Sequence, residues 1–377
     1  MVRFLHTSDW QLGVTRYLFS EGAQERYNQA RFDAIRALGR IAVESNCQFI
    51  AVCGDVFESN QVDRKTVARA LEALKEVPVP IWILPGNHDP LNEASVFFSS
   101  GFVQGKPAHV RVIADATPIQ IEGNVELVGA PWLSKRMVVN PFYEAIASLE
   151  PVTSVTRIIL AHGVVDLFTP KKDDPGVITT ENLERVISEK KASFLALGDR
   201  HSRTKIGMGE RIWYSGTPEV TDFGEDGAGY VQVVELDGDK VITTPVLVGQ
   251  WRFVEKDRVD INSAEDIEAL RRMLESLDQK ERTVLRLNLV GSISLTQEAT
   301  LWQSLDTISE VFATFEIRDD GLLVFPDNAD FSGLGFSGFA EVTIRRLREK
   351  MAGEVTEKGM TARDALMLLV RLGGGVE

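Results

Sequence analysis

The sequence predicts an α/β protein, and two observations carry that prediction. Short apolar runs with the length of buried strands alternate with longer segments whose apolar residues recur at helical spacing. This alternation is typical of a parallel or mixed sheet with helices packed on it. In addition, five of the apolar runs end directly in a loop that bears Asp, His or Asn. Proteins of this class place their chemistry at such strand ends.

The predicted elements follow one another in a regular order. In the first 100 residues they are a strand at 2–6, a helix at 26–44, a strand at 49–53, a helix at 64–75 and a strand at 81–84. Up to residue 248 we predict strands near 110–113, 118–121, 125–129, 157–161 and 194–197, helices near 142–149 and 181–190, and a hairpin at 230–248. Beyond residue 250, the order strand, helix, strand, helix, strand indicates a small α+β module.

Length and composition indicate several soluble domains. The 377 residues exceed one average domain, with 44% hydrophobic and 25% charged residues. We expect domains at 1–250 and 251–325, then a Gly-rich linker and two short helices in 326–377. No apolar run is long enough to cross a membrane and no signal peptide is apparent, so we expect a cytoplasmic protein. Cys47 and Cys53 lack metal-site spacing and are predicted to be buried, reduced thiols.

The strand-end loops supply side chains suited to a metal centre, namely Asp9, Gln11, Asp55, Asn87, His162, Asp199 and His201. Two divalent ions about 3.5–4 Å apart can bind both oxygens of an in-line phosphoryl displacement and activate water. Asp55 follows the central strand and is the natural bridge, because a carboxylate offers two charged oxygens. His88, beside Asn87, is expected to act on the leaving group. Taken alone, Gly86-Asn87-His88-Asp89 is equally typical of a capped turn.

The ordered motifs resemble those of the calcineurin-like metallophosphoesterases. Within that superfamily the chain is similar to the SbcD-type DNA repair exonucleases, nuclease subunits that work with SbcC-type coiled-coil ATPases. The motifs that carry this similarity are Leu5-His6-Thr7-Ser8-Asp9-Trp10, Gly54-Asp55-Val56-Phe57, Gly86-Asn87-His88-Asp89-Pro90, and Tyr214-Ser215-Gly216-Thr217-Pro218 followed by Asp222-Phe223-Gly224-Glu225. The resemblance covers residues 1–250 best. It implies a β-sandwich flanked by helices in four layers, an α+β capping domain and C-terminal helices.

The resemblance also implies a role for each site residue. It places one metal on Asp9, Asp55 and His201, and the other on Asp55, Asn87, His162 and Asp199, with His88 as the catalytic histidine. Two positions depart from the family pattern, because Gln11 and Asp199 each stand where the family has a histidine. Both departures exchange nitrogen for oxygen. We therefore expect two divalent ions, with Mn²⁺ favoured over Mg²⁺ or Zn²⁺.

The predicted function is a metal-dependent DNA exonuclease or endonuclease that acts in DNA repair and recombination. The predicted partners are DNA, a coiled-coil ATPase and a second copy of the chain. The net charge of −14 argues against nonspecific coating of nucleic acid, but Arg200, Arg203 and Lys205 are candidate contacts to the DNA backbone. A solvated loop is the alternative for these three residues.

Several alternatives stay open. The chain can instead be a cyclic-nucleotide or small-molecule phosphodiesterase of the same superfamily, or a catalytically weak DNA-end-binding scaffold, for which Gln11 and Asp199 argue. Asp89 either orients His88 or caps its loop, and His6 is expected to be a packed core histidine. The two terminal helices carry apolar residues, which are Val342, Ile344, Leu347 and Met351 in the first helix and Leu366, Leu368, Leu369 and Leu372 in the second. They dock either on the ATPase or on their own chain.

Overall fold

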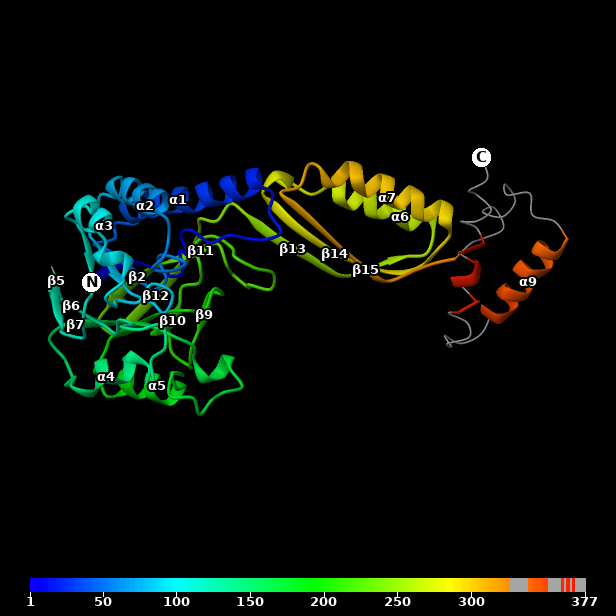
Figure 1. Cartoon of the computed structure of the whole chain (residues 1–377). Helices are drawn as coiled ribbons and strands as arrows, with labels where there is room; N and C mark the ends of the chain where they lie inside the picture. Colours follow the sequence, from blue (N-terminus) through cyan, green and yellow to red (C-terminus); the bar gives the residue numbers. More distant parts are fainter. Residues whose placement is uncertain (122, 326–337, 352–360, 363, 367, 370–377) are drawn as a thin grey trace. The chain divides into compact units, whose positions relative to one another are not determined.

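The computed structural model describes the chain except for residues 122, 326–337, 352–360, 363, 367 and 370–377. The chain divides into two compact units, Met1–Phe253 and Val254–Glu377. Figure 1 labels most of the helices and strands of both units.

The described residues of the first unit form two six-stranded sheets. The first sheet has the order β12-β11-β1-β2-β3-β4 and the second β5-β6-β7-β8-β10-β9. In the first, β1 (Val2–Thr7), β2 (Ile50–Cys53), β3 (Ile81–Leu84) and β4 (Val110–Val112) are parallel, and the hairpin of β11 (Tyr230–Asp237) and β12 (Lys240–Leu247) adds antiparallel strands. In the second, β6 (Val125–Gly129), β7 (Thr156–His162), β8 (Phe194–Gly198) and β10 (Ile212–Tyr214) are parallel, between the antiparallel edge strands β5 (Ile119–Ile121) and β9 (Thr204–Lys205). The α/β prediction is confirmed.

Buried apolar clusters join these elements into four layers. Between the sheets, Phe4 of β1 packs edge-on against Phe194 of β8, with ring centroids 5.7 Å apart. The outer face of the first sheet packs against α1 (Glu21–Glu44), α2 (Arg64–Lys75) and α3 (Ser100–Gly105), and that of the second against α4 (Pro141–Ala147) and α5 (Thr180–Ser188). Each fully buried large apolar side chain contributes about 1.5–3 kcal/mol. This is the helix, sheet, sheet, helix sandwich that the resemblance implied.

The first helix begins earlier than its periodicity indicated. It starts at Glu21 rather than near residue 26, because the Ser20 side chain accepts a hydrogen bond from the Ala23 backbone N–H and caps the helix. Residues 21–25 carry little apolar pattern, so periodicity alone could not find this start.

The second unit begins with a three-stranded sheet covered by two helices. In chain order its elements are β13 (Arg252–Ile261), α6 (Ala264–Glu275), β14 (Thr283–Ile293), α7 (Leu295–Ser309) and β15 (Thr314–Val324). The strand order is β13-β14-β15, and β14 runs parallel to β15. Leu270 and Leu274 of α6 and Leu301 and Leu305 of α7 are buried with Leu287 of β14 in one core. Among the described residues, short 3₁₀ turns occur at η1 (Val96–Phe98), η2 (Asp166–Phe168) and η3 (Lys280–Arg282).

The terminal helices pack on each other. Ile344 of α9 (Phe339–Met351) and Leu366 are buried together, and Leu347 and Leu369 pack against them. Phe339 is 87% exposed and Leu368 57%. The predicted linker, Leu372 and the Met351 side chain lie outside the described residues.

Other expectations concern the cysteines and the membrane. Cys47 and Cys53 are both buried, free thiols. In the part of the chain that the structure describes, no helix is long and apolar enough to cross a bilayer.

Candidate metal centre

The two sheets of the sandwich meet closely where their parallel strands end. The Asp9 N–H, just after β1, donates to the Gly54 carbonyl at 3.0 Å, and the Asp199 N–H donates to the Asp9 carboxylate at 3.1 Å. A Cβ on Gly198 would lie 1.7 Å from the Cys53 carbonyl oxygen. Only glycine permits this approach of β8 to β2, which brings the loops of both sheets to one place.

The backbone at four of the predicted ligands is left-handed. Asp9, Gln11, Asp55 and Asp199 have φ of 54°, 44°, 54° and 98°. For a residue with a Cβ this region costs about 1–2 kcal/mol, and such strain clusters at functional sites. The left-handed turn lets each side chain leave the end of its strand and point toward its neighbours.

The buried half of the centre gathers around His162. Asp9, Asp55 and His162 are buried, and their candidate ligand atoms all lie within 4.8 Å of one another. The His162 Nε2 lies 2.8 Å from Asn87 Oδ1, 3.4 Å from Asp55 Oδ2 and 3.7 Å from Asp199 Oδ1. Its Nδ1 donates to the Cys53 carbonyl at 2.8 Å, which fixes the ring with Nε2 toward the oxygens.

The other half is formed by Asp9, Gln11 and His201. The His201 Nε2 lies 4.0 Å from Asp9 Oδ1 and 3.0 Å from the Gln11 amide nitrogen. On the far side of the ring, Nδ1 lies 2.6 Å from Thr221 Oγ1 and 2.8 Å from Glu225 Oε1. The structure therefore brings all the predicted ligands together, with the carboxylates of Asp9 and Asp55 close to each other where the two groups meet.

The carboxylates dominate the electrostatics of the centre. Burial raises the pKa of Asp9, and burial also raises the pKa of Asp199 to about 6. Burial opposes ionisation of Asp55 as well, but the adjacent His162 imidazole holds its pKa below the usual value. For His162, burial disfavours the charged ring, yet the carboxylates of Asp55, Asp9 and Asp199 raise its pKa well above the ordinary value. A site that draws positive charge so strongly suits divalent cations.

The donor set also fits metal ions in its chemistry. Carboxylate, amide and imidazole groups converge on a small buried volume. The Nδ1 contact of His162 with the Cys53 carbonyl and the Asp199 N–H bond to Asp9 hold these groups in place. Oxygen donors outnumber the imidazoles of His162 and His201, and such a set suits Mn²⁺ or Mg²⁺ better than a thiolate or histidine cluster would.

His88 stands at the rim of the centre. Its backbone N–H donates to Asp55 Oδ1 at 3.0 Å, and its Nδ1 donates to the Glu58 carbonyl at 3.0 Å, so Nε2 is the ring nitrogen that stays available to a substrate. The side chain is 32% exposed, so it can reach a bound substrate. The Glu58 carboxylate, 3.7 Å from Nδ1, adds a negative charge behind the ring.

Asp89 caps the loop rather than orienting His88. Its carboxylate accepts hydrogen bonds from the backbone N–H groups of Gly86 at 2.8 Å and Phe57 at 3.0 Å. Burial raises its pKa to about 7. His6 is a core histidine, as predicted, since it is fully buried and its Nε2 donates to the Leu197 carbonyl.

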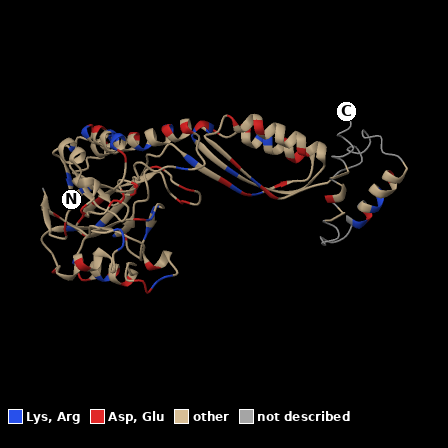
Figure 2. Cartoon of the chain, viewed as in Figure 1, with Lys and Arg blue, Asp and Glu red and all other residues tan. Residues whose placement is uncertain are grey.

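The candidate DNA contacts each have a partner within the chain. The Arg200 guanidinium lies 3.9 Å from the Phe168 ring centroid, and that of Arg203 lies 4.2 Å from the Trp213 ring centroid. Lys205 pairs with an exposed glutamate at 2.8 Å. Figure 2 shows Lys and Arg interspersed with Asp and Glu over the described chain.

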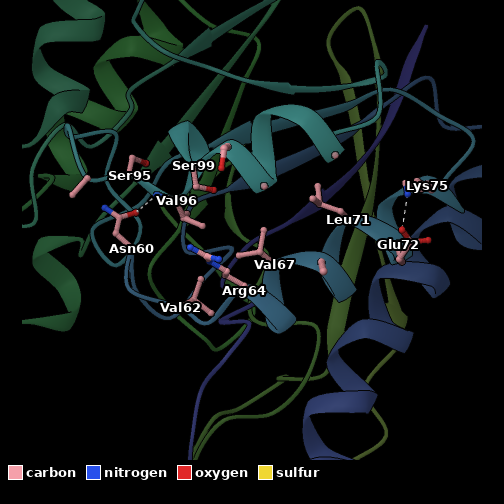
Figure 3. Close-up of a pocket in the computed structure, with 15 residues that line it drawn as sticks. Asn60, Val62, Arg64, Val67, Leu71, Glu72, Lys75, Ser95, Val96 and Ser99 are labelled. Carbon is pink, nitrogen blue, oxygen red and sulfur yellow. Dashed lines mark hydrogen bonds and ion pairs between the residues drawn. The ribbon is translucent and has the colours of Figure 1, made fainter.

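A cavity of about 560 Å³ lies away from the centre, between α2 and the segment that contains η1 and α3 (Figure 3). Its lining includes Asn60, Val67, Leu71 and Val96 but none of the predicted site residues. Asn60 on its wall donates to the Pro90 carbonyl at 2.9 Å, so the cavity borders the loop that carries His88.

Sequence reasoning missed the residues that hold the histidines. Glu58 carries the carbonyl that binds His88, while Thr221 and Glu225 bind His201. Glu225 appeared only as part of a family motif, and nothing local in the sequence links it to His201. Their role depends on contacts between distant segments.

The chain is similar to a family of known proteins and to several individual proteins. The calcineurin-like phosphoesterase model matches residues 2–234. The DNA double-strand break repair protein Mre11 of Saccharolobus solfataricus is 22% identical over 92% of this chain and 90% of its own length. The SbcD subunit of the nuclease SbcCD of Escherichia coli K12 is 24% identical over 74% of this chain and 82% of its own.

Among solved structures, a dimetal phosphatase from Danio rerio is similar with a TM-score of 0.42 and 14% identity, over 65% of this chain and 95% of that one.

The family model covers more than half of the 377 residues, and its span contains every predicted ligand. The chain belongs to the calcineurin-like phosphoesterase family.

Proposed function

We propose that this chain is a metal-dependent DNA nuclease that hydrolyses phosphodiester bonds with two divalent ions. The observation that carries the proposal is the convergence of the acidic, amide and imidazole side chains of five strand-end loops around Asp9, Asp55 and His162. The substrate class rests on the relatives, which are named a DNA repair protein and a nuclease subunit and match well beyond residue 234.

We assign one ion to Asp9, Asp55, Gln11 and His201, and the other to Asp55, Asn87, His162 and Asp199. When bound, the two ions would polarise the phosphodiester and lower the pKa of a bound water. The chain's own part is to hold the donors: the Cys53 carbonyl orients His162, and the Asp199 N–H holds the Asp9 carboxylate.

His88 is assigned to the leaving oxygen. The hydrogen bond from Nδ1 to the Glu58 carbonyl points Nε2 out of the loop, and the backbone bond to Asp55 keeps the ring beside the centre. From there the protonated ring, which carries N–H on both nitrogens, can donate a hydrogen bond from Nε2 to the departing oxygen or transfer that proton to it.

The identity of the ions follows from the donors. Gln11 and Asp199 supply oxygen where the family pattern has imidazole, so we propose Mn²⁺ or Mg²⁺ rather than Zn²⁺. Metal analysis of protein purified without chelator tests this choice. Tight, stoichiometric zinc would contradict it.

The remainder of the chain is assigned to a capping domain and to the binding of a partner protein. We propose that residues 251–325 form a capping domain, and that the helix pair around Ile344 and Leu366 docks on a coiled-coil ATPase. Phe339 and Leu368 support this assignment, because they stay exposed after the two segments have packed on each other. A truncation that ends near residue 330 should no longer co-purify with the ATPase, and retained binding would remove the idea.

Two alternative functions predict different results. A small-molecule phosphodiesterase should cleave cyclic nucleotides and leave DNA intact, although the matches to DNA repair relatives extend past the family model. A catalytically weak scaffold should bind DNA ends with no change in cleavage when His88 is replaced.

The deciding experiment offers linear duplex DNA, single-stranded DNA and cyclic nucleotides to the full chain with Mn²⁺, Mg²⁺ or Zn²⁺. His88→Ala should lower the DNA cleavage rate by about 10²–10⁴-fold. His109→Ala is the matched control, because His109 lies away from the centre and its Nε2 donates to the Leu74 carbonyl. Failure of the wild-type chain to cut any DNA with any of these ions would refute the nuclease assignment.

A further inference from the structure

The segment from Thr217 to Glu225 holds the Asp9 half of the centre. The Thr217 N–H donates to the His201 carbonyl at 3.0 Å, and the Thr217 hydroxyl lies 2.9 Å from the Asp9 carbonyl. A few residues later, Thr221 and Glu225 meet the His201 ring. One segment therefore fixes both the backbone and the imidazole of this half.

Glu225 itself is held firmly. Its Oε2 accepts a hydrogen bond from the Thr221 N–H at 2.8 Å, and its Oε1 accepts one from the Thr221 hydroxyl. The carboxylate is only 10% exposed. With its rotamer fixed in this way, Oε1 can accept a hydrogen bond from His201 Nδ1–H at 2.8 Å, beside the Thr221 Oγ1 at 2.6 Å. The proton-free Nε2 then presents its lone pair to the centre.

The contact at Gln11 agrees with this tautomer. The Gln11 amide nitrogen lies 3.0 Å from His201 Nε2, and an amide N–H there donates to an unprotonated ring nitrogen. Both halves of the centre thus use the same arrangement, in which Nδ1–H donates outward and Nε2 directs its lone pair inward. The acceptors differ, since His162 donates to a neutral backbone carbonyl and His201 to a carboxylate.

We propose that Glu225 is a positioning residue that makes His201 the principal nitrogen ligand of the half in which Gln11 supplies only an amide. A carboxylate behind an imidazole raises its basicity and fixes its orientation. The proposal rests on the ligand assignment made above for the proposed function. It adds that a charged acceptor stands behind the one imidazole of this half.

Titration of Mn²⁺ into the chelator-treated full chain, with free Mn²⁺ followed by its electron paramagnetic resonance signal, tests the proposal. Glu225→Gln keeps the side-chain size but loses the charge, and it should weaken one of two bound ions about 10–100-fold while the other keeps its affinity. Glu225→Asp should recover part of the loss. Glu181→Gln, which removes the same charge from the exposed first turn of α5, should behave as wild type.

The outcomes separate the two proposals. If the wild-type chain binds no divalent ion, the proposed function fails. If it binds two ions and Glu225→Gln leaves both affinities unchanged, or weakens both equally, only the role of Glu225 is refuted. Urea unfolding of each metal-free variant shows whether it is folded. If Glu225→Gln does not fold, Glu225→Asp takes its place, since it keeps the charge but draws the carboxylate away from His201 and should weaken the same ion by a smaller factor.

Discussion

Replacing Gly54 with alanine should damage the metal centre and the fold together. Gly54 precedes Asp55, has φ of 89°, and an added Cβ would lie 2.1 Å from His162 Nδ1. The left-handed backbone costs an alanine about 1–2 kcal/mol. In addition, His162 must leave its place against the Cys53 carbonyl, which adds about 1–3 kcal/mol for a buried carbonyl without its donor. We expect a total loss of roughly 2–5 kcal/mol of unfolding free energy.

A second glycine separates the cost of the backbone strain from the cost of displacing His162. Gly238, in the turn between β11 and β12, has φ of 60° and nothing within 4 Å of an added Cβ, so Gly238→Ala measures the backbone strain alone. Urea unfolding in the presence of a chelator gives both free energies, and a Mn²⁺ titration follows the centre. If Gly54→Ala loses no more stability than Gly238→Ala, or binds Mn²⁺ as the wild type does, the contact of Gly54 with His162 is not what requires glycine here.

Further predictions concern the ions and the histidines. Mn²⁺ at 100 times its dissociation constant should raise the unfolding free energy of the wild type by about 2.7 kcal/mol for each bound ion in urea titrations, and His162→Gln should lose most of the gain from the ion that it binds. Gln11→His should raise Zn²⁺ affinity about tenfold in competition with a chromophoric chelator, and an unchanged affinity would contradict the ligand role of position 11. Burial lowers the pKa of His6 to about 3, so the folded state binds fewer protons at this residue than the unfolded state does. The stabilising effect of the neutral His6 is present above pH 6.5 and is lost as the pH falls. Between pH 6 and pH 4, the unfolding free energy of the wild type should therefore fall by about 1.4 kcal/mol per pH unit more than that of His6→Gln. Equal pH dependence of the two unfolding free energies, measured in urea, would refute this.

The sequence alone determined the architecture and the family. Strands and helices were found because period-two and helical spacing of apolar residues is a local signal, and the resemblance was found because the motifs stand in fixed order. The α/β class and the family are both confirmed. The start of α1 was missed because its cap at Ser20 carries no periodicity.

Only the tertiary structure decided how the candidate residues are held. The left-handed turns at Asp9 and Asp55, the capping role of Asp89 and the contact of His201 with Glu225 all depend on segments that are distant in the chain. The type of a residue determines which bonds it can form, but the packing of the two sheets determines which partner it meets. At Gly198 the ends of the two sheets approach so closely that even a methyl group is excluded. For this reason the sequence named the candidate ligands, while the structure alone showed which neighbours hold them.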